Sequence, residues 1–191
     1  MLLFCVAPSP FARTGGGFDD RAGTKSQPPV LSVCEAIARR DELADRIVSV
    51  RGIVRGTMEG AWLNEGENCG SALITNGYKW DMVIWLETLR SVYEEKHADF
   101  AYDERAFEAV DREFKRKAHG KQDSTVVLTY TGLLYTYKDL SSHVIEYPNG
   151  RVRGFGFGHG GSAPVALLIK TVSDLQVLDS PDDTATHRER R

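Results

Sequence analysis

The sequence lacks the motifs that mark the common catalytic and metal-binding sites. Its 191 residues include three cysteines and five histidines, but no C-x-x-C pair, no H-E-x-x-H and no G-x-S-x-G. Zinc sites and serine-hydrolase sites need such spacings because their ligands or catalytic groups must converge on one point. The sequence therefore carries no specific catalytic signature, and we predict neither a metal nor a cofactor.

Two further absences restrict the class of protein and its partners. No apolar run approaches the roughly 20 residues that a membrane-spanning helix needs, so we expect no transmembrane segment. The formal net charge is −3, whereas a protein dedicated to phosphate backbones needs an excess of basic residues, so nucleic acid is a disfavoured partner. With 41% hydrophobic and 27% charged residues, the composition fits one ordinary globular domain with tails.

Three segments lie outside that domain, which we place at residues 32–178. Residues 1–12 have a short apolar core, then prolines and a final small residue, as at the end of a secretory signal peptide that lacks its basic start. We predict a truncated signal peptide and export to the periplasm or the exterior; the alternative is a frayed apolar terminus on a cytoplasmic protein. Residues 13–31 are rich in Gly, Ser, Thr and Pro and are predicted to form a flexible linker. The charged residues 179–191 are predicted to be a disordered tail.

The first half of the domain contains one short helix and three strand patterns. Ser32 and Glu35 have the spacing of a capping box, which predicts a short helix that begins at Val33. A β-branched run over residues 46–56 predicts a long strand that bends at Gly52. Two further strands are expected at residues 61–65 and 82–87.

The second half contains a longer helix and two long strands. An aspartate at the start, lysines in the last turn and an apolar stripe predict a helix over residues 103–118. A strand is predicted over residues 124–137, where Gly132 permits a second bend, and another over residues 165–178. Residues 138–164 are a long polar and glycine-rich connection between these two strands.

Three strands, a helix and two strands follow one another in the order of an OB-fold. We therefore predict a mainly β domain with helices: a five-stranded OB-fold-like barrel, with a helix between strands three and four and a short N-terminal helix. Two motifs stand out in this domain: Val33-Cys34-Glu35 followed by residues 47–52, and Gly156-Phe157-Gly158-His159-Gly160 ahead of the last strand. They resemble parts of uncharacterised, exported bacterial OB-fold-like proteins, and the resemblance implies an exported OB-like domain without assigned chemistry.

The most unusual stretch is RVRGFGFGHGGS, residues 151–162, which lies in the connection before the last strand. OB-folds often bind ligands through this connection. Its glycines would let the backbone approach a partner closely; alternatively, they serve only to pack the phenylalanines on the barrel. A dinucleotide site is disfavoured because a strand, rather than a helix, is predicted to follow the glycines. The ligand-binding candidates are Arg151, Arg153, Phe155, Phe157 and His159.

Three functions compete for these residues. We favour a non-enzymatic domain that binds an unknown protein or small ligand, because no catalytic set is present. The second is a small enzyme that uses His159 with Arg151 or Arg153 on an anionic substrate. The third is a single-stranded nucleic-acid-binding module with an aromatic stacking platform. A metal site made of His143 and His159 is a minor alternative. The aromatic residues of the stacking hypothesis are Trp85, Tyr130, Tyr135 and Tyr137.

The three cysteines help to predict whether the protein resides in an oxidising or a reducing compartment. Cys5 lies in the predicted leader, so its removal leaves Cys34 and Cys69 as an even pair. An oxidised, exported domain favours pairing of such cysteines. The hairpin predicted for the first two strands brings the start of one beside the end of the other, and these two cysteines lie on those flanks. We predict a Cys34–Cys69 disulfide; two free thiols are the alternative.

Overall fold

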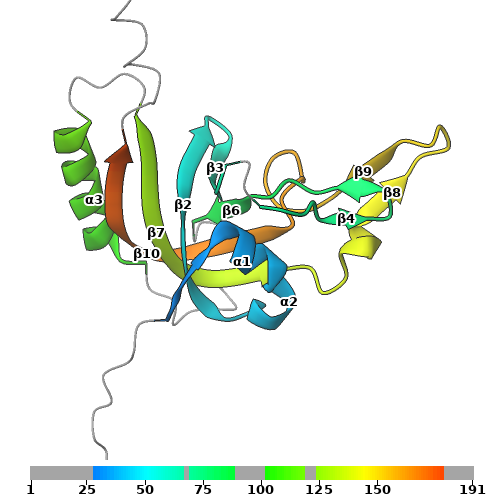
Figure 1. Cartoon of the computed structure of the whole chain (residues 1–191), viewed down its shortest axis with the longest axis horizontal. Coiled ribbons are helices and arrows are strands. Elements are labelled where there is room, and N and C mark those ends of the chain that lie inside the picture. The colour runs from blue at the N-terminus through cyan, green and yellow to red at the C-terminus, as the bar shows by residue number, and fades with distance from the viewer. Residues whose placement is uncertain (1–27, 67–68, 89–101, 119–123, 179–191) are drawn as a thin grey trace, which may run out of the picture.

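The computed structural model describes residues 28–66, 69–88, 102–118 and 124–178 (Figure 1). In these residues the chain is mainly β, with three α-helices, one six-stranded sheet and two two-stranded sheets. The large sheet consists of β1 (Val30–Ser32), β2 (Ile47–Thr57), β3 (Gly60–Asn64), β6 (Ile84–Glu87), β7 (Thr125–Thr136) and β10 (Val165–Leu178). The helices are α1 (Val33–Ala38), α2 (Arg40–Leu43) and α3 (Glu104–Lys117). One small sheet pairs β4 (Ile74–Thr75) with β5 (Tyr78–Lys79), and the other pairs β8 (Val144–Glu146) with β9 (Val152–Gly154). The 3₁₀ turn η1 (Leu140–His143) directly precedes β8.

The large sheet has the strand order β1-β2-β3-β6-β10-β7, and β2 also pairs with β7. As a result, β2, β3, β6, β10 and β7 each have strand neighbours on both sides. The pairings β1–β2 and β6–β10 are parallel, and the others are antiparallel. Gly132 marks the crowded middle of β7, because it pairs with Val48 of β2 and with Ile169 of β10.

The core lies on the inward faces of these strands and is covered by helices. Alternate residues such as Val50, Leu134 and Leu167 are fully buried, as expected where one face of each pleated strand meets a core. The helix α3 lies beside β10 in Figure 1, and its apolar stripe, with Phe107 and Phe114, packs against the same cluster. The helix α1 adds its own buried residues, Val33, Ala36 and Ile37.

Several local predictions are confirmed. Ser32 and Glu35 form the predicted capping box at the start of α1. Asp103 caps α3, and β10 has the predicted bounds. Each of these features depends on neighbours in the sequence, which is why local patterns find them.

The strand count differs from the prediction. The sheet has six strands rather than five, because β1 pairs in parallel with residues 49–51 of β2. This strand begins at Val30, inside the range predicted as linker, where two apolar residues follow a proline-rich stretch. The predicted signal peptide at residues 1–12, most of the linker and the tail at residues 179–191 lie outside the described residues. Of the helices in the described ranges, none is long and apolar enough to cross a membrane.

Candidate functional site

The connection between β7 and β10 carries the hairpin β8–β9, which projects with β4 away from the large sheet (Figure 1). Its tight turn runs from Tyr147 to Gly150, and Gly150 is the residue of this turn with a positive φ, which glycine adopts easily because it has no Cβ. Gly150 has a φ of 76° and donates its N–H to the Tyr147 carbonyl at 2.9 Å. The Asn149 side chain accepts the N–H of Arg151 at 3.1 Å.

The register of the hairpin determines which side chains share a face. Ile145 pairs with Arg153, and the backbone N–H of Tyr147 donates to the carbonyl of Arg151 at 2.8 Å. The N–H of Phe155 continues the ladder by donating to His143 at 2.8 Å. Side chains two residues apart lie on the same face of a strand, so one outward face carries apolar and cationic groups together. We call it the hairpin face, and it consists of Ile145, Tyr147, Arg151, Arg153 and Phe155.

The opposite face of the hairpin is used for packing within the chain. Gly154 is buried and lies so close to the ring of Tyr78 that an added Cβ would overlap it. Tyr78 in turn meets Trp80 edge to face, with ring centroids 4.9 Å apart. The hairpin is therefore fixed against β5 through its inner face, which leaves the hairpin face toward solvent.

The hairpin face combines exposed apolar surface with unpaired cations. The exposed fractions are 49% for Ile145, 41% for Tyr147 and 39% for Phe155. The Arg153 guanidinium carbon lies 5.1 Å from the Phe155 ring centroid, a cation–π distance. In the described part of the chain, neither Arg151 nor Arg153 has a carboxylate within ion-pair distance. A cleft of about 330 Å³ beside the two arginines is lined by Tyr147, Asn149, Arg151, Val152 and Arg153.

Three glycines of residues 151–162, at positions 154, 156 and 158, approach the chain's own aromatic rings. A Cβ on Gly156 would lie 2.7 Å from Trp80 Cζ3 and would also overlap the Ala163 carbonyl oxygen. Gly158, with a φ of 83°, lies against Trp85, so that a Cβ there would be 2.6 Å from Cε3. Close packing on rings of the same chain therefore accounts for Gly154, Gly156 and Gly158, whereas a Cβ on Gly160 would meet no atom within 4 Å.

Two of the five candidate residues lie away from the hairpin face. Phe157 is half-buried and stacks on Tyr137, with ring centroids 4.8 Å apart, and Tyr137 stacks on His143 at 3.6 Å. His159 is exposed over 68% of its side chain, and its Nε2 lies 3.4 Å from Oε1 of Glu59 in the β2–β3 turn. His159 does not line the cleft beside the two arginines. The structure thus brings together Arg151, Arg153 and Phe155 but not the full predicted set.

The residues suggested as a stacking platform do not share one surface. Tyr130 is buried in the core, and burial raises its pKa to about 12. Trp85 stacks on Trp62, with centroids 6.0 Å apart, and also supports Gly158. Tyr137 belongs to the stack with Phe157. These positions give the aromatic rings separate packing roles.

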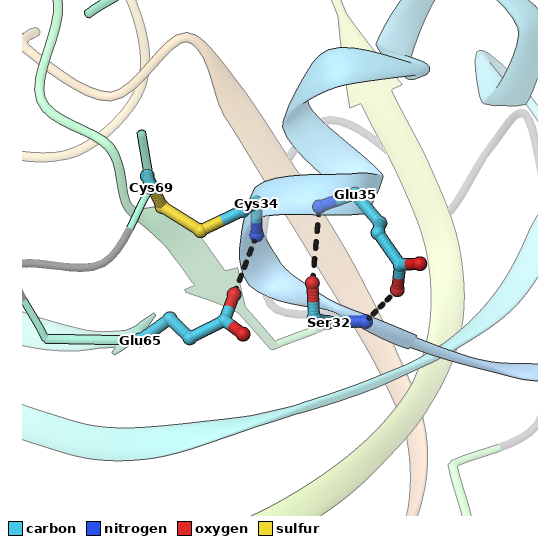
Figure 2. The surroundings of a disulfide bond; sticks show 5 residues. All are labelled: Ser32, Cys34, Glu35, Glu65 and Cys69. Carbon is cyan, nitrogen blue, oxygen red and sulfur yellow. Dashed lines mark hydrogen bonds between the residues drawn. A yellow bond between two sulfur atoms is a disulfide. The ribbon is translucent and has the colours of Figure 1, made fainter. Parts of the chain in front are cut away.

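The predicted disulfide between Cys34 and Cys69 is confirmed (Figure 2). The sulfur atoms are 2.06 Å apart, and the two Cα atoms are 5.2 Å apart. The Cys34 backbone N–H donates to Glu65 Oε2 at 2.9 Å, so the start of α1 is tied twice to residues that follow β3. In the described residues, a group of three possible metal ligands occurs at Cys34, Glu65 and Cys69, but its sulfurs are bonded to each other. His143 and His159 are not part of that group.

Sequence reasoning missed Ile145 and Tyr147, which complete the hairpin face. The signal was present: the Asn149-Gly150 pair lies between two short segments with alternating apolar residues, which is a hairpin pattern. Reading residues 138–164 as one irregular connection concealed it.

Comparison of the chain with protein-family models, with curated proteins and with solved structures finds no match.

Proposed function

We propose that this chain is a non-enzymatic, OB-fold-like binding domain that holds a partner protein on the hairpin face. The carrying observation is the register of β8 and β9, which pairs Arg153 with Ile145 and Arg151 with Tyr147 on one exposed face. Exposed apolar groups beside cations are typical of protein interaction surfaces, where aromatic residues and arginine are enriched.

The strand pairing supports the OB-fold part of the proposal. A closed five-stranded barrel needs each strand to have two neighbours, and β2, β3, β6, β10 and β7 have them in that order. The helix α3 lies between the third and fourth of these strands in the sequence, as in an OB-fold. The hairpin belongs to the connection between the fourth and fifth strands, from which OB-folds commonly contact ligands. The resemblance of residues 33–35, 47–52 and 156–160 to motifs of uncharacterised OB-fold-like proteins agrees with this assignment.

A binding role fits the side chains better than the two competing functions. The enzyme hypothesis needs His159 beside Arg151 or Arg153, but the cleft that holds the arginines does not include this histidine. The nucleic-acid hypothesis needs a stacking platform, and Tyr130 is buried in the core. The net charge of −3 also opposes a general affinity for phosphate.

We further propose that the protein acts outside the cytoplasm. The Cys34–Cys69 disulfide gives weak support, because disulfides persist mainly in oxidising compartments. The apolar start of the sequence, which resembles the end of a signal peptide, agrees with this location.

Site-specific photocrosslinking in the cells of origin tests the proposed binding role. A photoreactive phenylalanine analogue at Tyr147 should yield a discrete crosslinked protein. Met58 is fully exposed and lies in the β2–β3 turn, so the same analogue at Met58 is the matched control and should yield none. Equal adducts from both positions, or none from Tyr147, would contradict binding through the hairpin face.

A further inference from the structure

We infer that the hairpin face binds an extended segment of the partner. In this segment three alternate residues face the hairpin: the first two are acidic and the third is apolar. This inference rests on the proposed function and specifies its partner. The three matching groups are Arg151, Arg153 and Phe155, which follow one another along the outward side of β9 and the residues after it.

The charge of the face calls for carboxylates. Arg151 and Arg153 are both exposed, and the hairpin face carries no acidic side chain. The nearby Glu146 pairs with Val152 and so belongs to the opposite face. A guanidinium group binds a carboxylate through two parallel hydrogen bonds, so Arg151 and Arg153 can each bind one carboxylate.

The spacing of the face calls for an extended segment. Successive side chains on one side of a strand are separated by about 6.7 Å, twice the rise per residue. An extended segment that lies along β9 has the same repeat, so its every second side chain meets Arg151, Arg153 and then Phe155. A helical segment would present side chains at three- and four-residue spacing and would miss this row.

The neighbouring strand supplies an apolar border. Ile145 lies opposite Arg153 and Tyr147 lies opposite Arg151, and both are partly exposed. Apolar groups beside an ion pair exclude water from it, which strengthens the electrostatic attraction. The face therefore favours acidic residues flanked by apolar ones over a purely acidic tract.

Selection from a library of short random peptides tests this inference with the intact protein. The wild-type chain is the target, and enriched peptides are then measured against three variants by fluorescence anisotropy. Arg151→Gln/Arg153→Gln removes the charges, and Ile145→Ser/Tyr147→Ser removes the apolar border. Lys138→Gln is the control, because Lys138 is a cation of the same connection that precedes the hairpin. Thermal melting of each variant shows whether it is folded.

The outcomes separate the inference from the proposed function. We expect the enriched peptides to carry two acidic residues with one residue between them. The affinity of these peptides for the protein should fall about tenfold in Arg151→Gln/Arg153→Gln and stay unchanged in Lys138→Gln. Peptides without acidic residues that still need Ile145 and Tyr147 would overturn the inference and leave the proposed function standing. If no peptide distinguishes wild type from either hairpin variant, both fail. Tighter binding of a short oligothymidine, lost in the arginine variant, would identify a nucleic-acid surface instead.

Discussion

The indole of Trp85 lies directly against Gly158, with space for a hydrogen but not for a methyl group between them. Gly156 stands in the same relation to Trp80, and Gly154 to Tyr78. Every second residue of this segment is thus a glycine seated on an aromatic ring. Arg153 and Phe155, which alternate with these glycines, are exposed.

Alanine at Gly156 should destabilise the protein. The added methyl group would overlap the Ala163 carbonyl oxygen, which itself accepts the N–H of Phe157, so the backbone has to shift. We expect a loss of about 1–3 kcal/mol in the free energy of unfolding, measured by urea denaturation. Gly160 has open space around it, so Gly160→Ala is the control and should be nearly neutral. Similar midpoints for the two variants would contradict the packing role of these glycines.

Valine at Gly132 should destabilise the sheet at its most crowded point. A Cβ there would overlap the carbonyl oxygen of Leu168 on β10, while β2 pairs with the other side of β7. We expect a loss of roughly 1–3 kcal/mol through overpacking. Gly52→Val should act in the same direction, because its Cβ would be 2.7 Å from Val33 Cγ2. Melting temperatures unchanged in both variants would show that the strands do not cross as closely as described.

Removing the disulfide should lower stability without changing the fold. The bond joins residues 35 positions apart, and for a loop of this size the chain-entropy model gives roughly 3–4 kcal/mol. The double variant Cys34→Ser/Cys69→Ser should show this loss in denaturant titrations. A thiol assay that finds both Cys34 and Cys69 free in protein isolated under oxidising conditions would contradict the bond.

Stability should fall at high pH because of Tyr130. Burial raises the pKa of this phenol from 10.0 to about 12, so the unfolded chain loses the proton at lower pH than the folded one. The stability that the protonated Tyr130 phenol contributes is fully present below pH 10. It is lost as the pH rises toward 12, and the free energy of unfolding falls by roughly 2–3 kcal/mol in all. Tyr130→Phe should therefore show a shallower decline of stability over this range. The same slope in both proteins would mean that Tyr130 ionises freely in the folded state.

The parts of the fold that local patterns specify could be predicted from the sequence. The capping box of Ser32 and Glu35 and the long strand at residues 165–178 follow from side-chain spacing alone. The strand β1 could not, because its three residues are held by parallel pairing with β2 and carry no periodic pattern of their own. Short strands such as β4 and β5 have the same difficulty.

The candidate site shows a similar division. Arg151, Arg153 and Phe155 could be singled out because charge and aromatic residues alternate with glycine. Their sharing of a face with Ile145 depends on the register across the turn, which the sequence of β9 alone does not contain. His159 instead lies beside Glu59, 100 positions earlier in the chain, a contact that the local sequence around residue 159 does not contain.

Hydrogen–deuterium exchange of the whole protein, alone and with the partner identified through the Tyr147 crosslink, tests binding by the hairpin face most directly. The amides of residues 144–155 should exchange more slowly in the complex, because the partner covers the exposed ladder between β8 and β9. The amides of α3, on the other side of the sheet, should be unchanged (Figure 1). Protection of α3 with no change in the hairpin would contradict the account.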